Sequence, residues 1–194
     1  MITHIDQLDL RKSYSYADYL KWHFEDRVEL IQGKIFKMSP APSRKHQQVS
    51  FRLGGIFYRL LIENPCEAFS APFDVRLPKQ SSNDEEIFTV VQPDLCIICD
   101  HDKLDEKGCS GAPDLIVEIL SPHTSKKDLR DKYDLYEESG VEEYWVVYPE
   151  ENTMEVYKQN GLGKFAFDKV YVIGDIVEVN FLGIKVEMDE VFNS

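Results

Sequence analysis

The stretch that decides the fold of this chain is Pro113-Asp114-Leu115-Ile116-Val117-Glu118-Ile119-Leu120. Side chains of a β-strand alternate between its two faces, and both faces of this stretch are apolar except at the acids. A strand that is apolar on both sides is typical of the centre of a sheet covered by other elements on each face. An ionised Glu118 in such a strand is costly unless a cation meets it.

A second apolar stretch carries another acid, in the sequence Val90-Val91-Gln92-Pro93-Asp94-Leu95-Cys96-Ile97-Ile98. Asp94 enters this run directly after Pro93, and proline is tolerated at the first residue of a strand. Two carboxylates that are brought together repel, and a divalent cation relieves the repulsion. The two stretches therefore predict a metal site built on Asp94 and Glu118.

A helix and a third strand follow the stretch that contains Glu118. Leu129, Tyr133 and Tyr136 recur with the helical period from about Thr124 onwards, and Gly140 is a natural C-terminal cap. The apolar run at 143–148 then closes a strand, helix, strand unit. This order predicts that the strands at 113–120 and 143–148 pair in parallel.

The rest of the chain alternates short apolar runs with turn signals. We expect one helix over residues 16–24, capped by Ser15 or Ser13, and a longer helix that begins after Ser43. Gln32-Gly33 predicts a hairpin turn. Further strands are expected at 28–31, 34–38, 73–77 and 87–91, and an antiparallel meander at 154–157, 165–170 and 176–179.

Length and composition bound the class of protein. The chain has 194 residues, which we interpret as a single domain over 1–194 that needs no disulfide to bury a core. No tract is apolar enough to span a bilayer, and the first residues lack the features of a signal peptide, so a cytoplasmic protein without membrane contact is expected.

The cysteines include one pair in C-x-x-C spacing, Cys96 and Cys99. Residues three apart in a strand point to opposite faces, which argues against zinc or redox chemistry at this pair. All four cysteines, which also include Cys66 and Cys109, are interpreted as small buried hydrophobic residues in a reducing compartment.

The residues around the two acids resemble the PD-(D/E)XK nuclease superfamily. Pro93-Asp94 matches its first element and Glu118-Ile119-Leu120 its second, although Leu120 stands where the motif places lysine. More closely, residues 92–145 resemble a bacterial family of restriction endonucleases first catalogued as a domain of unknown function. The resemblance extends from residue 28 to about 177 and implies an α/β fold of the restriction-endonuclease-like type. That fold has a mixed central sheet flanked by helices, here with an additional antiparallel C-terminal portion.

The resemblance also implies a site and a cofactor. Asp94 and Glu118 would hold Mg²⁺, with Mn²⁺ as an alternative, and Glu29 would be an additional ligand or else a solvated hairpin acid. A lysine from the following helix would replace the missing one: Lys132 is the first candidate, and Lys126 and Lys127 are alternatives.

Several of these residues also have ordinary structural interpretations. Lys132 could instead pair with Asp128, four residues earlier on the same helix. His46 could bind phosphate or assist proton transfer, or be a half-exposed helix histidine. Asp114 is expected to bind loop amides, and Tyr144 and Trp145 are expected to pack in the core.

The resemblance implies metal-dependent cleavage of DNA phosphodiester bonds by a homodimer. A net charge of −13 disfavours a DNA partner, although small basic clusters such as Arg44-Lys45 occur. Two alternatives stay open. One is a catalytically inactive binding or regulatory protein of the same fold, and the other is a metal-dependent hydrolase of a small phosphoester.

Overall fold

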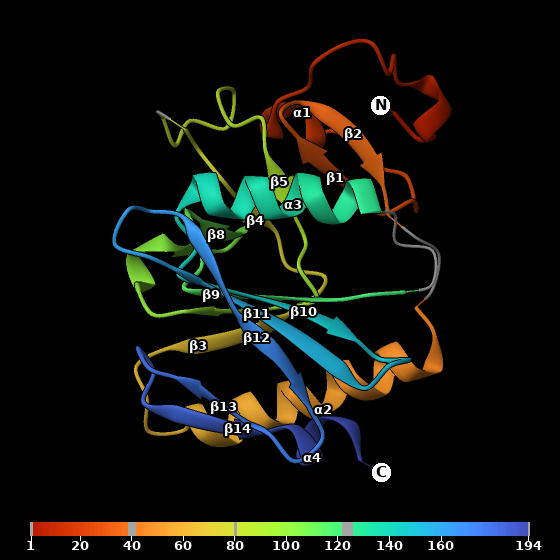
Figure 1. Cartoon of the computed structure of the whole chain (residues 1–194). Helices are drawn as coiled ribbons and strands as arrows, with labels where there is room; N and C mark the ends of the chain where they lie inside the picture. The colour runs from red at the N-terminus through yellow and green to blue at the C-terminus, as the bar shows by residue number, and fades with distance from the viewer. Residues whose placement is uncertain (1, 39–41, 80, 122–125, 194) are drawn as a thin grey trace.

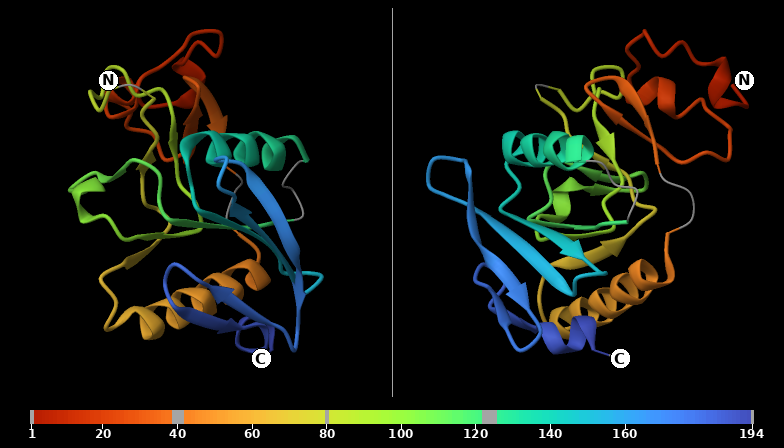
Figure 2. Two further views of the ribbon diagram at one scale, coloured as in Figure 1. Left: turned by 60° about the vertical axis from the view of Figure 1, so that its left-hand side comes forward. Right: turned by 45° about the vertical axis from the view of Figure 1, so that its right-hand side comes forward.

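The centre of the computed structural model is a six-stranded mixed sheet in the order β12-β11-β10-β9-β6-β3. The structure describes residues 2–38, 42–79, 81–121 and 126–193, with only the backbone of 126–128. Helix α3 covers one face of this sheet and helix α2 the other, as the three views in Figures 1 and 2 agree. The predicted mixed sheet between helices is confirmed.

The two acid-bearing stretches are adjacent central strands. Strands β6 (Leu95–Ile98) and β9 (Leu115–Ile119) pair antiparallel, and every residue of both strands is buried. Strand β10 (Glu143–Tyr148) pairs in parallel with β9, after the crossover through α3 (Lys126–Ser139). The predicted parallel unit is confirmed, and Gly140 ends α3 with a positive φ of 87° that suits glycine. The expected start of this helix, at residues 122–125, lies outside the described residues.

The two faces of the sheet bury separate cores. Leu115, Val117 and Ile119 pack with the apolar side of α2 (Arg44–Leu61), whereas Ile116 packs with Leu135 and others on the side of α3. Ser43 caps α2 by accepting a hydrogen bond from the backbone of His46 at 3.2 Å, as its sequence predicts. Because Glu118 and Ile116 are two residues apart, Glu118 belongs to the face that α3 covers.

A second six-stranded sheet lies on the α3 side, and it was not expected from the sequence. Its order is β2-β1-β5-β4-β8-β7. It contains the predicted hairpin of β1 and β2, whose turn residues Gln32 and Gly33 both have positive φ. Its strands are β1 (Val28–Ile31), β2 (Lys34–Lys37), β4 (Val75–Arg76), β5 (Val90–Val91), β7 (Leu104–Asp105) and β8 (Gly108–Ser110).

The C-terminal part is antiparallel, but the predicted single meander is wrong for residues 176–179, which pair with residues 184–187 and not with the strand at 165–172. β11 and β12 extend the central sheet, and β13 and β14 make a separate hairpin next to α2 (Figure 1). No helix in the described ranges is long and apolar enough to cross a membrane. The remaining elements are β3 (Glu67–Ser70), β11 (Thr153–Gln159), β12 (Phe165–Val172), β13 (Ile176–Val179), β14 (Ile184–Glu187), α4 (Met188–Phe192) and the short helices η1 (Ile5–Gln7) and η2 (His101–Lys103).

The first predicted helix is much shorter than expected. Helix α1 covers only Tyr16–Tyr19, with Ser15 as its N-cap, so the prediction of a helix to residue 24 is wrong. Trp22 instead stacks on Phe24 and packs edge-on against Tyr14. These aromatic contacts within residues 14–24 outweigh the weak preference of a short segment for the helix.

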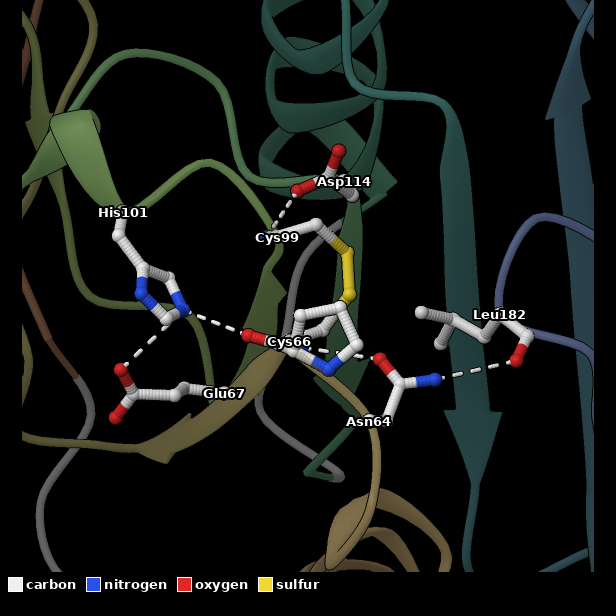
Figure 3. Close-up of a disulfide and its surroundings, with 8 residues drawn as sticks. Asn64, Cys66, Glu67, Cys99, His101, Asp114 and Leu182 are labelled. Carbon is white, nitrogen blue, oxygen red and sulfur yellow. Dashed lines mark hydrogen bonds and ion pairs between the residues drawn. A yellow bond between two sulfur atoms is a disulfide. The ribbon is translucent and has the colours of Figure 1, made fainter.

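Two of the cysteines are paired, contrary to the sequence interpretation. Cys66 and Cys99 form a disulfide, with 4.0 Å between their Cα atoms (Figure 3). Cys96 and Cys109 are free and buried. The edge strand β3, which was not predicted, pairs antiparallel with β6 through Glu67 and Ile98. Continuing that register by one residue sets Cys66 opposite Cys99, which is why the two thiols meet.

A buried acid at the start of β10 gives a prediction about stability. Glu143 is 3% exposed, and burial raises its pKa to about 7 although Trp145 Nε1 donates a hydrogen bond to it at 2.7 Å. The unfolded chain loses this proton near pH 4.5, so stability falls as the pH rises from there to about 7.

Replacing Glu143 with Gln keeps an acceptor for Trp145 and removes the charge. We expect E143Q to be more stable than wild type by about 2 to 3 kcal/mol at pH 8 and to differ little at pH 4.5. Urea unfolding at the two pH values measures this. A gain of equal size at both values would contradict it.

Candidate active site

The register of the central strands brings the two predicted metal ligands together. Leu95 pairs with Val117 in the antiparallel ladder, and one further residue along places Asp94 opposite Glu118. Directly opposed residues of an antiparallel pair lie on the same face. The backbone N–H of Ile119 also donates to Asp94 Oδ2 at 2.7 Å, which fixes the Asp94 carboxylate against β9.

Lys132 reaches this face from α3. Its ammonium group donates to Glu118 Oε1 at 2.8 Å and to Glu29 Oε1 at 3.0 Å, and its side chain is only 15% exposed. Tyr136, one helical turn later, donates its hydroxyl to Glu118 Oε1 at 2.6 Å. Residues four apart lie on one face of a helix, so α3 presents both donors to the same carboxylate.

The third acid comes from the second sheet. Glu29 lies on β1 and is 5% exposed, so it is not a solvated hairpin acid. Besides the contact with Lys132, its Oε1 atom accepts a hydrogen bond from the backbone N–H of Gln92 at 2.9 Å. Gln92 lies two residues before Asp94, and this bond therefore ties β1 to the segment that carries Asp94.

The cluster has more negative than positive groups. Burial raises the pKa of Glu118 to about 7, and Asp94 and Glu29 add to this shift against the opposing effect of Lys132. Burial would lower the pKa of Lys132, but the charges of Glu118 and Glu29 outweigh it and raise that pKa above its ordinary value. Lys132 is therefore the group that stays charged, and Glu118 is the acid that takes up a proton unless another cation approaches.

A histidine completes the surroundings of Asp94. His46, on the first turn of α2, places Nε2 3.2 Å from Asp94 Oδ1 and is 7% exposed, which is more buried than a half-exposed surface histidine. Its Nδ1 atom is buried and has no hydrogen-bond partner among the residues that the structure describes. The ring is held by Asp94 on one side and has an unused polar atom on the other.

The donor set suits a hard divalent cation. Within the described ranges, no group of three or more His, Cys, Asp or Glu side chains is arranged to hold a metal ion. Mg²⁺, however, keeps several of its waters and commonly binds through one or two carboxylates. The facing pair Asp94 and Glu118 meets that requirement, and Glu29 contacts the same lysine as Glu118.

The other candidates of the sequence have simpler roles or fall outside the described side chains. Asp114 Oδ2 accepts from the backbone N–H of Cys99 at 2.7 Å, as predicted for a residue that binds loop amides. Leu120 is partly buried in the apolar core on the α3 side. The side chains of Lys126, Lys127 and Asp128 lie outside the described part of the chain.

The sequence reasoning missed one residue of this cluster, Tyr136. Its position four residues after Lys132 was a usable signal, because it puts the hydroxyl on the same helical face as the ammonium group. Tyr144 and Trp145 were correctly predicted as core residues and are 1% and 0% exposed.

The mixed sheet, the facing acids and the lysine define a nuclease fold of the PD-(D/E)XK type. The chain belongs to the Uma2 family, described as "Putative restriction endonuclease", whose model matches residues 16–188. An "Uncharacterized protein slr1290" of Synechocystis sp. (strain ATCC 27184 / PCC 6803 / Kazusa) is 25% identical over 195 residues, covering 99% of this chain and 97% of that protein.

A solved structure has the same fold. It is described as "a putative nuclease belonging to DUF820 from Anabaena variabilis ATCC 29413", and it superposes with a TM-score of 0.72 at 20% identity. The likeness covers 92% of this chain and 97% of that one.

Proposed function

We propose that this protein hydrolyses DNA phosphodiester bonds with the help of Mg²⁺ or Mn²⁺, which Asp94 and Glu118 would hold. The observation that carries the proposal is the excess of negative charge: the buried acids Glu118 and Glu29 share one lysine, the partly buried Asp94 lies opposite Glu118, and the pKa of Glu118 is raised to about 7. Burying such a group of acids is costly unless a cation compensates it. The family assignment supports a nuclease in general.

We assign to Lys132 the role of the lysine in the PD-(D/E)XK motif. When bound, the metal ion would supply Lewis-acid polarisation of the phosphate and a more acidic water. Glu118 and Glu29 hold the ammonium group of Lys132 in one place, where it can orient the attacking water and offset charge that develops on the phosphate. Tyr136 fixes the Glu118 carboxylate, and Ile119 fixes that of Asp94.

The pH dependence of cation uptake follows from Glu118. Its pKa of about 7 means that below this pH a proton competes with the metal ion for the carboxylate. We expect the affinity for Mn²⁺ to fall by up to about tenfold per unit below pH 7 and to level off above about pH 8. Calorimetric titration at several pH values measures this, and an affinity that is constant from about pH 6 to 8 would contradict it.

Plasmid cleavage tests the activity itself. We expect supercoiled DNA to be nicked or linearised with Mg²⁺ or Mn²⁺ and left intact with EDTA. The matched control is E143Q, which changes a buried acid of the same central sheet away from the cluster and should cleave like wild type. A wild-type protein that is inert with every metal and substrate, yet binds a partner, would favour the inactive regulatory protein, which Leu120 and the charge of −13 also suit.

A salt titration separates DNA from a small phosphoester as the substrate. Binding to duplex DNA releases counterions, so its affinity should fall steeply as salt is added. A hydrolase of small phosphoesters should show little affinity for DNA at any salt concentration.

If the protein cuts both strands of a duplex, we expect a homodimer, because each active site then cuts one strand. Sedimentation measures the oligomeric state.

A further inference from the structure

Three polar residues meet where three strands of the second sheet end at one edge. In that sheet β5 lies between β1 and β4 and pairs antiparallel with both. The residue after β5 therefore lies beside the residues before β1 and β4, and these three are Gln92, Arg27 and Asp74. Gln92 is the middle one, and it precedes the proposed metal ligand Asp94 by two residues.

The amide group of Gln92 uses all of its hydrogen-bonding capacity in this junction. Its Nε2 atom donates to Asp74 Oδ1 at 2.8 Å and to the Tyr19 hydroxyl at 3.3 Å. Its Oε1 atom accepts from Nη2 and Nε of Arg27 at 2.9 and 3.3 Å. An ionised carboxylate only accepts and a guanidinium only donates, so a single orientation of the amide satisfies both neighbours.

Asp74 is itself held by α1 and by β8. The Tyr16 hydroxyl donates to Asp74 Oδ2 at 3.3 Å, and the Tyr19 hydroxyl donates to Oδ1 at 3.4 Å. The backbone N–H of Cys109, on β8, donates to Asp74 O at 2.9 Å. Burial and the charge of Asp74 raise the pKa of both tyrosine hydroxyls, so they remain donors. The amide of Gln92 is therefore attached to an anchored acceptor.

The backbone of Gln92 connects this junction to the acid cluster. Its N–H donates to Glu29 Oε1 at 2.9 Å, and the same oxygen accepts from Lys132 at 3.0 Å. Pro93 then restricts the backbone between Gln92 and Asp94, because the proline ring fixes φ. The side-chain hydrogen bonds of Gln92 go to residues outside the cluster. Gln92 can therefore influence the site through its backbone without touching the reacting groups.

We propose that Gln92 is a positioning residue of the active site: its clamped amide holds the backbone N–H that binds Glu29 and sets the direction in which the chain reaches Asp94. The inference rests on the proposed function and deepens it, because α1 and the second sheet then support the acids from outside the cluster. Loss of such an outer partner of a metal ligand commonly lowers metal affinity by about 10- to 100-fold. A purely structural amide would instead hold α1 on the sheet and leave the acids in place.

The test is amide hydrogen exchange in the metal-free protein, measured by NMR at two backbone N–H groups. The N–H of Gln92 donates to Glu29, and the N–H of Ile119 donates to Asp94 Oδ2 at 2.7 Å. Their exchange therefore reports whether the two acids stay in place. The internal control is the N–H of Leu120, which lies next to Ile119 but donates to a carbonyl of β10 at 2.9 Å.

A charge reversal across the junction supplies the variants. Q92E keeps an acceptor for Arg27 but sets a second carboxylate against Asp74, so we expect both reporter N–H groups to exchange about tenfold faster or more. Uptake of Mn²⁺ should weaken by about tenfold. D74N in the Q92E background supplies an N–H to the new carboxylate and should restore both properties to within about threefold of wild type. The matched control is Y14F, because the Tyr14 hydroxyl hydrogen-bonds with the backbone of Asp9 instead.

A milder variant keeps the inference testable if Q92E does not fold. Y19F removes the hydroxyl that Gln92 and Asp74 share, and it should speed exchange at the same two N–H groups by a smaller factor. Unchanged exchange at both groups in the folded variants would overturn the inference. An equal rise at Leu120 would also overturn it, as would a Q92E effect that D74N does not reverse.

Cleavage and Mn²⁺ uptake by wild type are measured separately. A wild type that neither takes up Mn²⁺ nor cleaves DNA, in which exchange still changes as expected in Q92E, would overturn the proposed hydrolysis and support the role of Gln92 in placing the acids. An active wild type with a Q92E variant that cleaves equally well would overturn only this inference.

Discussion

Replacing Lys132 with methionine should reduce DNA cleavage by about 10²- to 10⁴-fold and also destabilise the protein. The ammonium group is the partner of two buried acids, at 2.8 Å from Glu118 and 3.0 Å from Glu29. Removing one member of a buried ion pair leaves an uncompensated charge, which costs about 3 to 5 kcal/mol. Plasmid cleavage and urea unfolding measure the two effects.

The loss of stability in K132M should depend on pH in a definite direction. Without the lysine, the pKa of Glu118 rises further above its usual range, because burial and the neighbouring acids act unopposed. Stability is then lost as the pH rises through that higher folded pKa and is regained when Glu118 takes up a proton at lower pH. The deficit should therefore be larger at pH 8 than at pH 5.

A suitable control for K132M is K185M, which removes an exposed lysine paired with Glu178 on the C-terminal hairpin. It should change stability by less than about 1 kcal/mol and leave cleavage intact. If K132M cleaves DNA like K185M while being equally well folded, Lys132 is a structural residue and another group replaces the motif lysine.

Replacing Glu118 with glutamine should abolish cleavage, by about 10³-fold or more, while the fold is kept. Glutamine has nearly the same shape and still offers an oxygen to Tyr136 and Lys132, which contact Glu118 Oε1 at 2.6 and 2.8 Å. It lacks the charge that would bind the cation, so uptake of Mn²⁺ in calorimetry should be lost as well.

The comparison of E118Q with E143Q isolates the role of the site. Both changes neutralise a buried acid of the central sheet whose pKa is raised to about 7. A purely structural role for both acids predicts the same outcome for the two variants. We expect E143Q to keep both cleavage and Mn²⁺ uptake, and a loss of activity in E143Q comparable to that in E118Q would contradict the assignment.

Much of this cluster could be predicted because its geometry is local. Alternation within a strand fixes the face of Glu118, and helical spacing places Lys132 on a defined side of α3. The parallel pairing of β9 and β10 then follows from the order of strand, helix and strand. These rules place Lys132 of α3 near Glu118 of the preceding strand β9. Applying them requires no information about the rest of the chain.

The features that the sequence did not predict depend on pairing between strands that are far apart in the sequence. Strand β3 is recognised only by its partner β6, and the disulfide between Cys66 and Cys99 follows from that pairing. Four of the six strands of the second sheet lie within predicted segments (28–31, 34–38, 73–77 and 87–91), but the sheet itself was not predicted, because its pairing joins segments far apart in the sequence, such as Val75 with Cys109. Whether Glu29 is buried in the site or solvated also depended on how this sheet packs, so the sequence left both interpretations open.

The most direct test of the account is a crystal of this protein soaked in Mn²⁺ and measured for anomalous scattering. The account predicts a peak within ligand distance of carboxylate oxygens of both Asp94 and Glu118. Manganese that binds elsewhere, or no peak at that pair in crystals of the well-folded protein, would contradict the central claim that these two facing acids hold the catalytic cation.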